Sequence, residues 1–331
     1  MGRSDAPRRR VANIFILNVP ASRSFPLIAV VGPTGAGKSD LALFLAEQLG
    51  GEIVNYDSVQ VYRGLEIGAA KVPPGQRKGI PHHLIDIIDL DDELTAGEYA
   101  RRARQVLTYL ASENKIPILV GGTGFYLRAL LDGLSPAPGR DETLRNRLSE
   151  IAGRQPAALH RFLRLHDPAS AARIHPNDHQ KLIRAIELTA GGQPASKTQS
   201  APRERLRGFA YLKIGLAPDR PELYRRLDER TAGMFHGGLL EEMRELLEAG
   251  YTPECKALQS LGYKQAAQVL AGEISVSAAI RKTQTKTRQY AKRQITWFRT
   301  ETDVRWLNGF GNEKRIQSEA SRLSRDFLNA S

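Results

Sequence analysis

Apolar runs alternate with helical repeats in the first third of the chain. Residues 26–31 and 116–120 form continuous apolar runs, which predict strands buried on both faces of a parallel sheet. Residues 40–51 carry apolar side chains at helical spacing and end on two glycines, and residues 52–57 indicate another strand. The alternation predicts an α/β fold whose parallel sheet is flanked by helices.

The pattern becomes purely helical in the middle of the chain. A capping box at Thr95 to Glu98 opens a helix that extends to about residue 114, and residues 139–192 contain four helical segments. A polar linker follows, strand character returns at 211–216, and the remainder is mostly helical. We therefore expect a core made of residues 26–138 and 203–331, a small all-helical insertion domain at 139–202, and a disordered extension at 1–25.

A glycine-rich loop follows the first predicted strand. The stretch GPTGAGKS has the complete P-loop spacing, and it lies between a strand and a helix. In that context successive N–H groups and the positive end of the helix dipole converge on a phosphate. The predicted phosphate-binding residues are Gly32, Pro33, Thr34, Gly35, Ala36, Gly37, Lys38 and Ser39.

The acidic partner of a nucleotide-hydrolysing P-loop is missing from its usual place. Such proteins hold Mg²⁺ with the loop Ser/Thr and an acid at the end of another strand, but residues 116–120 are followed by Gly121 and Gly122. Asp57 could bind the metal or act as a base on a second substrate, and a plain turn role is at least as consistent with Asp before Ser. Thr123 fits a tight turn and a phosphate contact equally well.

Charge and cysteine content bear on the partner and the compartment. The chain has 48 Lys and Arg against 36 Asp and Glu, a net charge of +12, which favours a polyanionic partner. The single Cys255 excludes a disulfide framework and suits a reducing cytosol. The adjacent His82 and His83 favour a structural role over metal binding. No segment is long enough to span a membrane, and Asn13 and Asn18 interrupt the short N-terminal apolar run.

A basic stretch lies near the C-terminus. Residues 274–300 contain no acidic residue and predict a helix capped by Ser277, with Arg281, Arg288 and Lys292 on one face. An unbalanced basic face suits a phosphodiester backbone, whereas the neighbouring Trp297 and Phe298 are expected in the core. A weaker basic cluster on the insertion consists of Gln180, Lys181 and Arg184.

Five motifs in fixed order give the chain a family resemblance. GPTGAGKS, DSVQVY, GGTGFY, NDHQKLIRAIE and RQITWFR resemble the bacterial tRNA dimethylallyltransferases of the IPP transferase family, over about residues 27–299. These are P-loop prenyltransferases that modify the N6 amine of adenosine 37 in tRNA. The zinc-finger extension of eukaryotic relatives is absent, which fits a bacterial type.

The resemblance implies a role for each motif. The P-loop would hold the diphosphate of dimethylallyl diphosphate, with Ser39 placing Mg²⁺ and Arg220 as a further candidate. Asp57 would be the general base, and Thr123 and Arg145 would contact the reacting region beside Lys38. The residues expected to contact the tRNA anticodon stem-loop are Asp57, Ser58, Val59, Gln60, Gln180, Lys181, Leu182, Ile183, Arg184, Arg288, Lys292, Arg293 and Gln294. A cytoplasmic monomer is expected.

Three other functions are compatible with parts of the sequence. A small-molecule or nucleoside kinase would share the P-loop but leaves the basic stretch unexplained. An adenylate isopentenyltransferase would need neither the insertion nor the basic helix. A non-catalytic RNA-binding protein would have no use for Lys38 in a P-loop.

Overall fold

The computed structural model describes residues 24–198 and 202–330. Six parallel strands form one sheet in the order β3-β2-β4-β1-β5-β6. Their bounds are β1 Phe25–Val31, β2 Glu52–Asn55, β3 His82–His83, β4 Pro117–Val120, β5 Phe209–Leu216 and β6 Val304–Leu307. The predicted α/β class with a parallel sheet is confirmed, and the extension predicted as disordered lies almost wholly outside the described residues.

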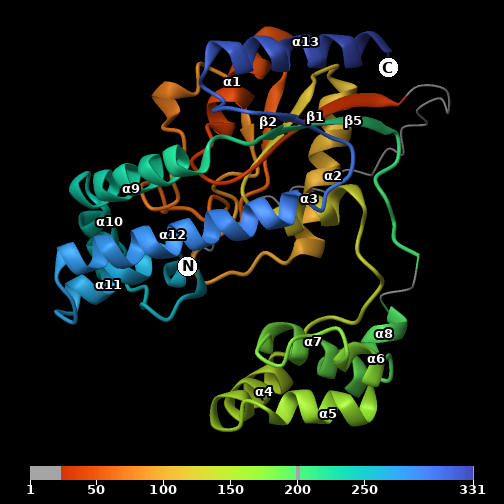
Figure 1. Ribbon diagram of the computed structural model, residues 1–331, viewed down its shortest axis with the longest axis vertical. Coiled ribbons are helices and arrows are strands. Elements are labelled where there is room, and N and C mark those ends of the chain that lie inside the picture. Colours follow the sequence, from red (N-terminus) through yellow and green to blue (C-terminus); the bar gives the residue numbers. More distant parts are fainter. Residues whose placement is uncertain (1–23, 199–201, 331) are drawn as a thin grey trace, which may run out of the picture.

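Helices cover both faces of the sheet. On β1, Ile28 and Val30 face the side covered by α1 (Lys38–Leu49) and α13 (Lys314–Ala330), whereas Leu27 and Ala29 face the opposite side. There the sheet packs against α2 (Ala96–Ser112) and α3 (Gly124–Leu131) (Figure 1). Alternate side chains of a strand point to opposite faces, so an apolar run without alternation fits a strand covered on both sides.

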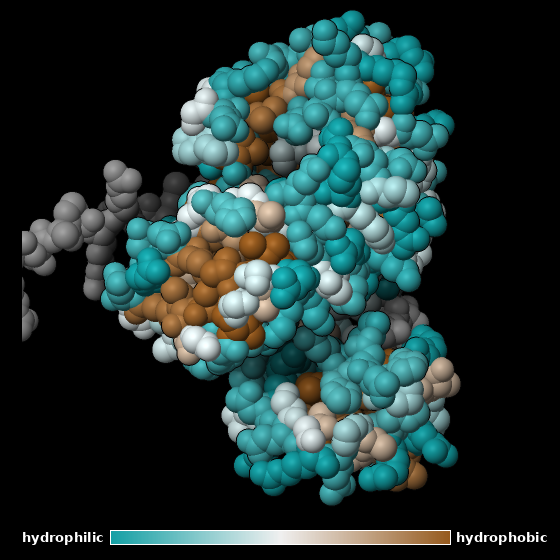
Figure 2. Space-filling view, turned by 60° about the vertical axis from the view of Figure 1, so that its left-hand side comes forward, coloured by the Kyte–Doolittle hydropathy of each residue, from teal (hydrophilic) through white to brown (hydrophobic). Residues whose placement is uncertain are grey.

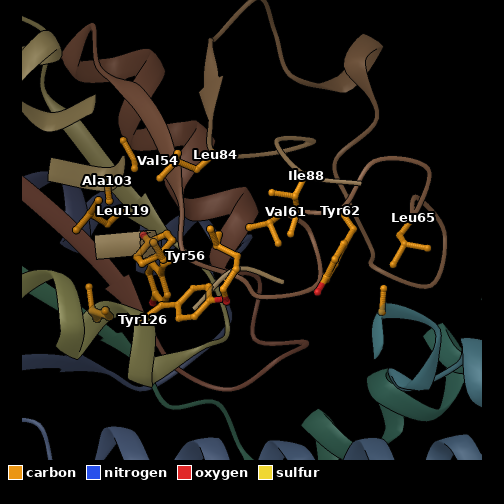
Figure 3. Packing of buried hydrophobic residues seen from close by; sticks show 14 of the residues in the cluster. Val54, Tyr56, Val61, Tyr62, Leu65, Leu84, Ile88, Ala103, Leu119 and Tyr126 are labelled. Atoms are coloured by element: carbon orange, nitrogen blue, oxygen red, sulfur yellow. The ribbon is translucent and has the colours of Figure 1, made fainter. Parts of the chain in front are cut away.

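Three tyrosines occupy the core below the carboxyl ends of β2 and β4. The rings of Tyr99 and Tyr126 stack with centroids 4.4 Å apart. Tyr56 lies in the same cluster, and Figure 3 shows it near Tyr126. Each hydroxyl donates to a backbone oxygen; the Tyr56 hydroxyl, for example, lies 2.6 Å from the oxygen of Val30. Buried tyrosines need such partners, and the bonds to Val30 and Asn55 connect this cluster to the ends of β1 and β2.

The C-terminal half supplies helices that wrap the same end of the sheet. They are α9 (Arg220–His236), α10 (Leu239–Glu248), α11 (Tyr263–Leu270) and α12 (Val276–Phe298), with a short 3₁₀ turn at Lys256–Gln259. Another 3₁₀ turn, Pro74–Gln76, lies between β2 and β3. The basic stretch is helical as predicted, but its cap is Ser275, whose hydroxyl accepts from the N–H of Ala278 at 3.3 Å. Ser277 is wrong as the cap because it already lies inside the first turn.

The middle of the chain forms a separate helical lobe. It contains α4 (Glu142–Arg154), α5 (Ala158–His166), α6 (Pro168–Ala171), α7 (His179–Ala190) and α8 (Ala195–Thr198). Figures 1 and 2 show it below the main body, and its buried residues make a cluster of their own. Aspartates at 141, 167 and 178 cap three of its helices, as the sequence pattern indicates.

The two chain segments that connect the lobe to the core meet at its base. The N–H of Leu206 donates to the oxygen of Leu131 at 2.9 Å. Gly133 has a φ of +73°, and a Cβ there would lie 2.3 Å from the oxygen of Glu204. The entering and leaving segments are therefore in backbone contact, and glycine is needed at this crossing. No helix among residues 24–198 and 202–330 is long and apolar enough to cross a membrane.

Candidate active site

The glycine-rich loop turns sharply at the end of β1. Gly35 and Gly37 have φ values of +78° and +79°, a region that favours glycine, and α1 begins directly afterwards at Lys38. Lys38 is buried, and its Nζ donates to the oxygen of Pro33 at 2.8 Å. Burial lowers the pKa of Lys38 to about 7, although the Asp57 carboxylate acts in the opposite direction. The loop thus presents an amine whose protonated form a bound anion would favour.

This loop lines a cavity of about 490 Å³. Two arginines from α9, Arg226 and Arg230, line it together with Lys38 and Ser39. The guanidinium of Arg230 donates to the Thr34 hydroxyl at 2.8 Å, and burial lowers its pKa. Three basic side chains therefore line the cavity together with the carboxylates of Asp40 and Asp57, and basic groups gathered in this way suit a polyanion such as a diphosphate. We call it the anion cavity.

Sequence reasoning missed both arginines of α9. Arg226 stacks over Phe310 at 3.6 Å from the ring centroid and donates to the Oδ1 of Asn312 at 3.2 Å. The available signal was their spacing, since residues four apart lie on the same face of a helix. Nothing in the sequence placed that helix beside a loop nearly 200 residues earlier in the chain.

Asp57 lies at the junction of two cavities. A second cavity of about 320 Å³, which we call the inner cavity, shares Asp57, Arg230 and Tyr290 with the anion cavity and has apolar lining from Val59 and Met234. One carboxylate oxygen of Asp57 accepts from the N–H of Val59 at 2.9 Å. The residue therefore makes the turn that its sequence context suggested, and it also presents a carboxylate between an anion site and a partly apolar site.

Thr123 joins the two strand ends. Its hydroxyl accepts from the N–H of Ser58 at 2.9 Å and donates to the Ser58 hydroxyl at 3.0 Å. Thr123 stands at the N-cap position of α3, where its backbone oxygen accepts from the N–H of Tyr126 at 2.9 Å but its side chain makes no cap hydrogen bond. Gln60 lines the anion cavity, and its amide donates to the backbone oxygens of Ala69 and Ala70. These bonds fix the segment after Asp57.

Gln294 connects α12 to the site from the opposite side. Its Oε1 accepts from the N–H of Thr34 at 2.7 Å, and its Nε2 donates to the oxygen of Gly122 at 2.7 Å. The side chain is buried, and both atoms of its amide have a partner within the protein. Tyr290, one turn earlier on the same face, donates to the Gly122 oxygen at 3.4 Å. The basic helix thereby forms one wall of the anion cavity.

Four of the residues expected at the site or the RNA surface lie elsewhere. Arg145 is in the helical lobe, where it pairs with Glu187 at 3.3 Å. Leu182 and Ile183 are buried in the core of that lobe, which removes both from any surface an RNA could contact. Arg220 lies outside the anion cavity and stacks on Tyr224.

The remaining polar residues of the lobe are at its surface. Gln180 and Lys181 are exposed, and Lys181 pairs with Asp178 at 2.7 Å. Arg184 binds Glu187 at 2.6 Å and the oxygen of Pro138 at 2.9 Å. Glu187 therefore anchors two arginines near the base of the lobe.

The exposed face of α12 keeps part of its predicted charge. Lys292 and Arg293 are exposed, whereas Arg288 forms an ion pair with Asp228. Phe298 is fully buried as expected. Trp297 is partly buried against Gly124 and has the Arg128 guanidinium 4.2 Å above its ring.

The histidine pair has protein partners. His83 binds Glu52 at 2.7 Å, and His82 contacts the backbone oxygen of Ile80 at 2.8 Å. Within the described residues, no group of three or more His, Cys, Asp or Glu could hold a metal ion by itself. A metal at the anion cavity would thus depend on ligands supplied by the bound anion.

Comparisons with known proteins agree on one family. Residues 60–301 match the IPP transferase family. The tRNA dimethylallyltransferase of Solibacter usitatus is 53% identical over 92% of this chain and 99% of its own length, and that of Koribacter versatilis is 51% identical over 90% and 97%.

Solved structures agree with the sequence relatives. The tRNA isopentenylpyrophosphate transferase of Bacillus halodurans aligns with a TM-score of 0.69 at 34% identity, covering 92% of this chain and 97% of its own. A eukaryotic dimethylallyltransferase acting on tRNA aligns with a TM-score of 0.78 at 28% identity, over 93% of this chain and 80% of its own.

Proposed function

The chain belongs to the IPP transferase family, and from this premise we propose the reaction that it performs. As a tRNA dimethylallyltransferase it transfers a dimethylallyl group from dimethylallyl diphosphate to the N6 amine of adenosine 37 and releases diphosphate. One observation supports this most directly: Asp57 stands where the anion cavity meets the inner cavity. A base placed between a leaving-group site and a site for a planar ring suits alkyl transfer to an amine.

The leaving diphosphate is assigned to the anion cavity. Negative charge grows on its bridging oxygen as the allylic carbon–oxygen bond breaks, and cations fixed in advance stabilise that charge most in the transition state. Lys38, Arg226 and Arg230 supply those cations. The N–H of Thr34 is already bonded to Gln294, so the arginines of α9 add contacts that this amide cannot make.

Asp57 activates the amine. An exocyclic adenine amine is a weak nucleophile, and a carboxylate that accepts one of its hydrogens raises its reactivity. The turn bond from Val59 to one oxygen orients the carboxylate, and within the described chain the other oxygen has no hydrogen-bond donor. When the N6–carbon bond forms, that carboxylate takes the N6 proton.

Ser39 and Asp40 are the residues that would hold Mg²⁺ at the anion cavity. Both line it, and Mg²⁺ is often held by one or two protein oxygens together with substrate phosphates. The pKa of Asp40 is raised by burial, an effect that a bound cation reverses. When bound, the ion neutralises charge on the departing diphosphate.

The tRNA is assigned to the space between the main body and the helical lobe. Lys292 and Arg293 expose positive charge on α12, and Lys181 is exposed on α7, where it pairs with Asp178. Figure 1 shows α12 in the main body and α7 in the lobe below it. Adenosine 37 has to leave its stack to reach Asp57, at a cost of a few kcal/mol that backbone contacts offset. We assign the enzyme to the cytoplasm, as a monomer.

The decisive experiment supplies both possible donors. The protein is incubated with unmodified tRNA and radiolabelled dimethylallyl diphosphate, in parallel with γ-labelled ATP, and free AMP replaces tRNA in a third reaction. We expect label in tRNA only from the prenyl donor. Transfer of phosphate from ATP, or prenylation of AMP in preference to tRNA, would contradict the proposal.

A further inference from the structure

A third cavity lies on the other side of α12 from the reacting groups. Its volume is about 500 Å³, and its floor includes Gly32 and Pro33, the first two residues of the glycine-rich loop. Arg220, Lys292 and Arg299 line it. It shares no lining residue with the anion cavity, although different residues of the glycine-rich loop contribute to each. We call it the outer cavity. It has no part in the reaction described above.

The outer cavity is positively charged without compensation. Its lining contains no carboxylate. Within the described residues, Arg220 makes its contacts with Tyr224, and no ion pair joins Lys292 or Arg299 to an acid. By contrast, Arg288 on the same helix is neutralised by Asp228. Three uncompensated cations around one hollow attract an anion, most strongly at low salt.

An exposed indole completes this cavity. Trp306 lies on β6, and its ring packs so closely on β5 that a Cβ at Gly215 would be 2.4 Å from Cε3. Trp306 lines the cavity, and about 37% of the whole residue is exposed. A ring held in place by the sheet, with open surface beside cations, is suited to stacking on a nucleobase whose phosphate binds the arginines.

The outer cavity continues the basic surface of α12. Lys292 and Thr296 border both this cavity and the groove that contains Arg128, Arg293 and Trp297. The two residues form a ridge on the helix, and a polynucleotide crossing the ridge would meet positive charge on both sides. A free nucleotide could bind the same cations and the same ring, but it is too short to contact both the cavity and the adjoining groove.

We propose that the outer cavity binds one nucleotide of the RNA substrate outside the reacting loop, with its phosphate on Arg220 and Arg299 and its base on Trp306. This inference rests on the proposed function for the identity of the RNA. It gives Arg220 a place in the RNA interface in place of the diphosphate contact expected from the sequence. The contact adds affinity and takes no part in the transfer step.

The test compares two double variants with equal loss of charge. Arg220→Gln with Arg299→Gln empties the cavity of guanidinium groups, and Lys314→Gln with Arg325→Gln removes two exposed charges from α13. At 0.15 M salt we expect the first pair to weaken tRNA binding at least fivefold and to lower the log–log salt slope by about 1 to 2. The control pair should change the affinity less than twofold. Pyrophosphate affinity and kcat at saturating tRNA should stay at wild-type values in both.

Other outcomes are equally informative. Equal Kd values and salt slopes for the two double variants would overturn the proposal. Trp306→Ala should also weaken tRNA binding at least fivefold, and Trp306→Phe should restore most of it. If AMP instead binds with micromolar affinity that Arg220→Gln with Arg299→Gln abolishes, while tRNA affinity is unchanged, the occupant is a free nucleotide and the RNA assignment fails. Since binding is measured without turnover, a failure of the proposed prenyl transfer would leave these results unaffected and distinguishable.

Discussion

The amide of Gln294 on α12 accepts a 2.7 Å hydrogen bond from the N–H of Thr34, 260 positions earlier in the chain. The same amide donates to Gly122 at 2.7 Å, so one side chain holds together the glycine-rich loop and the loop after β4. These loops follow neighbouring strands, and both contribute to the anion cavity. The shape of the cavity thus depends on a residue that the sequence places on a basic helix.

Replacing Gln294 by Ala should damage both the fold and the site. The change leaves the partly buried N–H of Thr34 without its partner, which costs about 1–3 kcal/mol, and leaves the Gly122 oxygen with only the longer 3.4 Å bond from Tyr290. We expect a lower free energy of unfolding in urea and a weaker affinity for pyrophosphate. Gln284→Ala is the matched control, since Gln284 lies on the same helix and donates only to the backbone of Asp228. Equal effects of the two substitutions would contradict the special role of Gln294.

The cation assignment can be tested on α9. Arg230→Gln should weaken pyrophosphate binding at least tenfold, because a partly buried guanidinium in the wall of the anion cavity is lost. Arg225→Gln removes the same charge from the same helix, but Arg225 is exposed and pairs with Glu222 and Glu229. Titration calorimetry should show a near wild-type affinity for the Arg225 variant. If both variants lose affinity alike, net charge and not position is responsible.

Removal of the base should separate binding from chemistry. Asp57→Asn keeps an oxygen that can accept from Val59 but no longer takes a proton, so kcat should fall by about 10² to 10⁴. The Kd for tRNA, measured by fluorescence anisotropy, should change less than twofold. A variant that binds tRNA poorly but turns over bound tRNA at the normal rate would refute the assignment.

Anion binding should be linked to protonation of Lys38. Its pKa is lowered to about 7 in the free protein, so at pH 8 the amine is mostly neutral. A bound diphosphate favours the ammonium and raises that pKa, so binding takes up a proton, and affinity falls as pH rises above about 7. Calorimetry at pH 8 in two buffers of different ionisation enthalpy measures this uptake. The difference between wild type and Lys38→Gln isolates it from protons bound by pyrophosphate itself, and an identical uptake in both would exclude Lys38.

The packing of α12 on α3 predicts a contrast between two glycines. A Cβ at Gly124 would lie 2.2 Å from the Nε1 of Trp297, whereas one at Gly153 in α4 would have no neighbour within 4 Å. Gly124→Ala should therefore destabilise the protein by about 1–3 kcal/mol through overpacking. Gly153→Ala should be neutral or stabilise by up to about 1 kcal/mol, because alanine favours the helix. Urea unfolding of both variants decides between these outcomes.

Local patterns were sufficient for most of the fold. The apolar runs predicted β1, β2, β4 and β5, and Thr95 caps α2 as the capping box indicates. The short β3 and the edge strand β6 were missed, since two or four residues with mixed polarity give no period to recognise. The cap at Ser275 was missed because two serines near one helix start are indistinguishable without the backbone.

The site was predictable only where the chemistry lies within one motif. The spacing of GPTGAGKS located the loop around Lys38, and the strand end located Asp57. Arg226 and Arg230 reach the loop through tertiary packing of α9, which no local pattern encodes. Leu182 and Ile183 were included because their motif resembles the family's, but helical periodicity directs them into the lobe's core.

At the contact of Gly133 with Glu204, the segment that enters the helical lobe lies against the segment that leaves it. Because these two connecting segments leave the main body at one point, a linker of a few residues could replace the whole lobe. The sheet would lose none of its strands. Replacing the lobe at this junction would therefore leave both the sheet and the lining of the anion cavity in place.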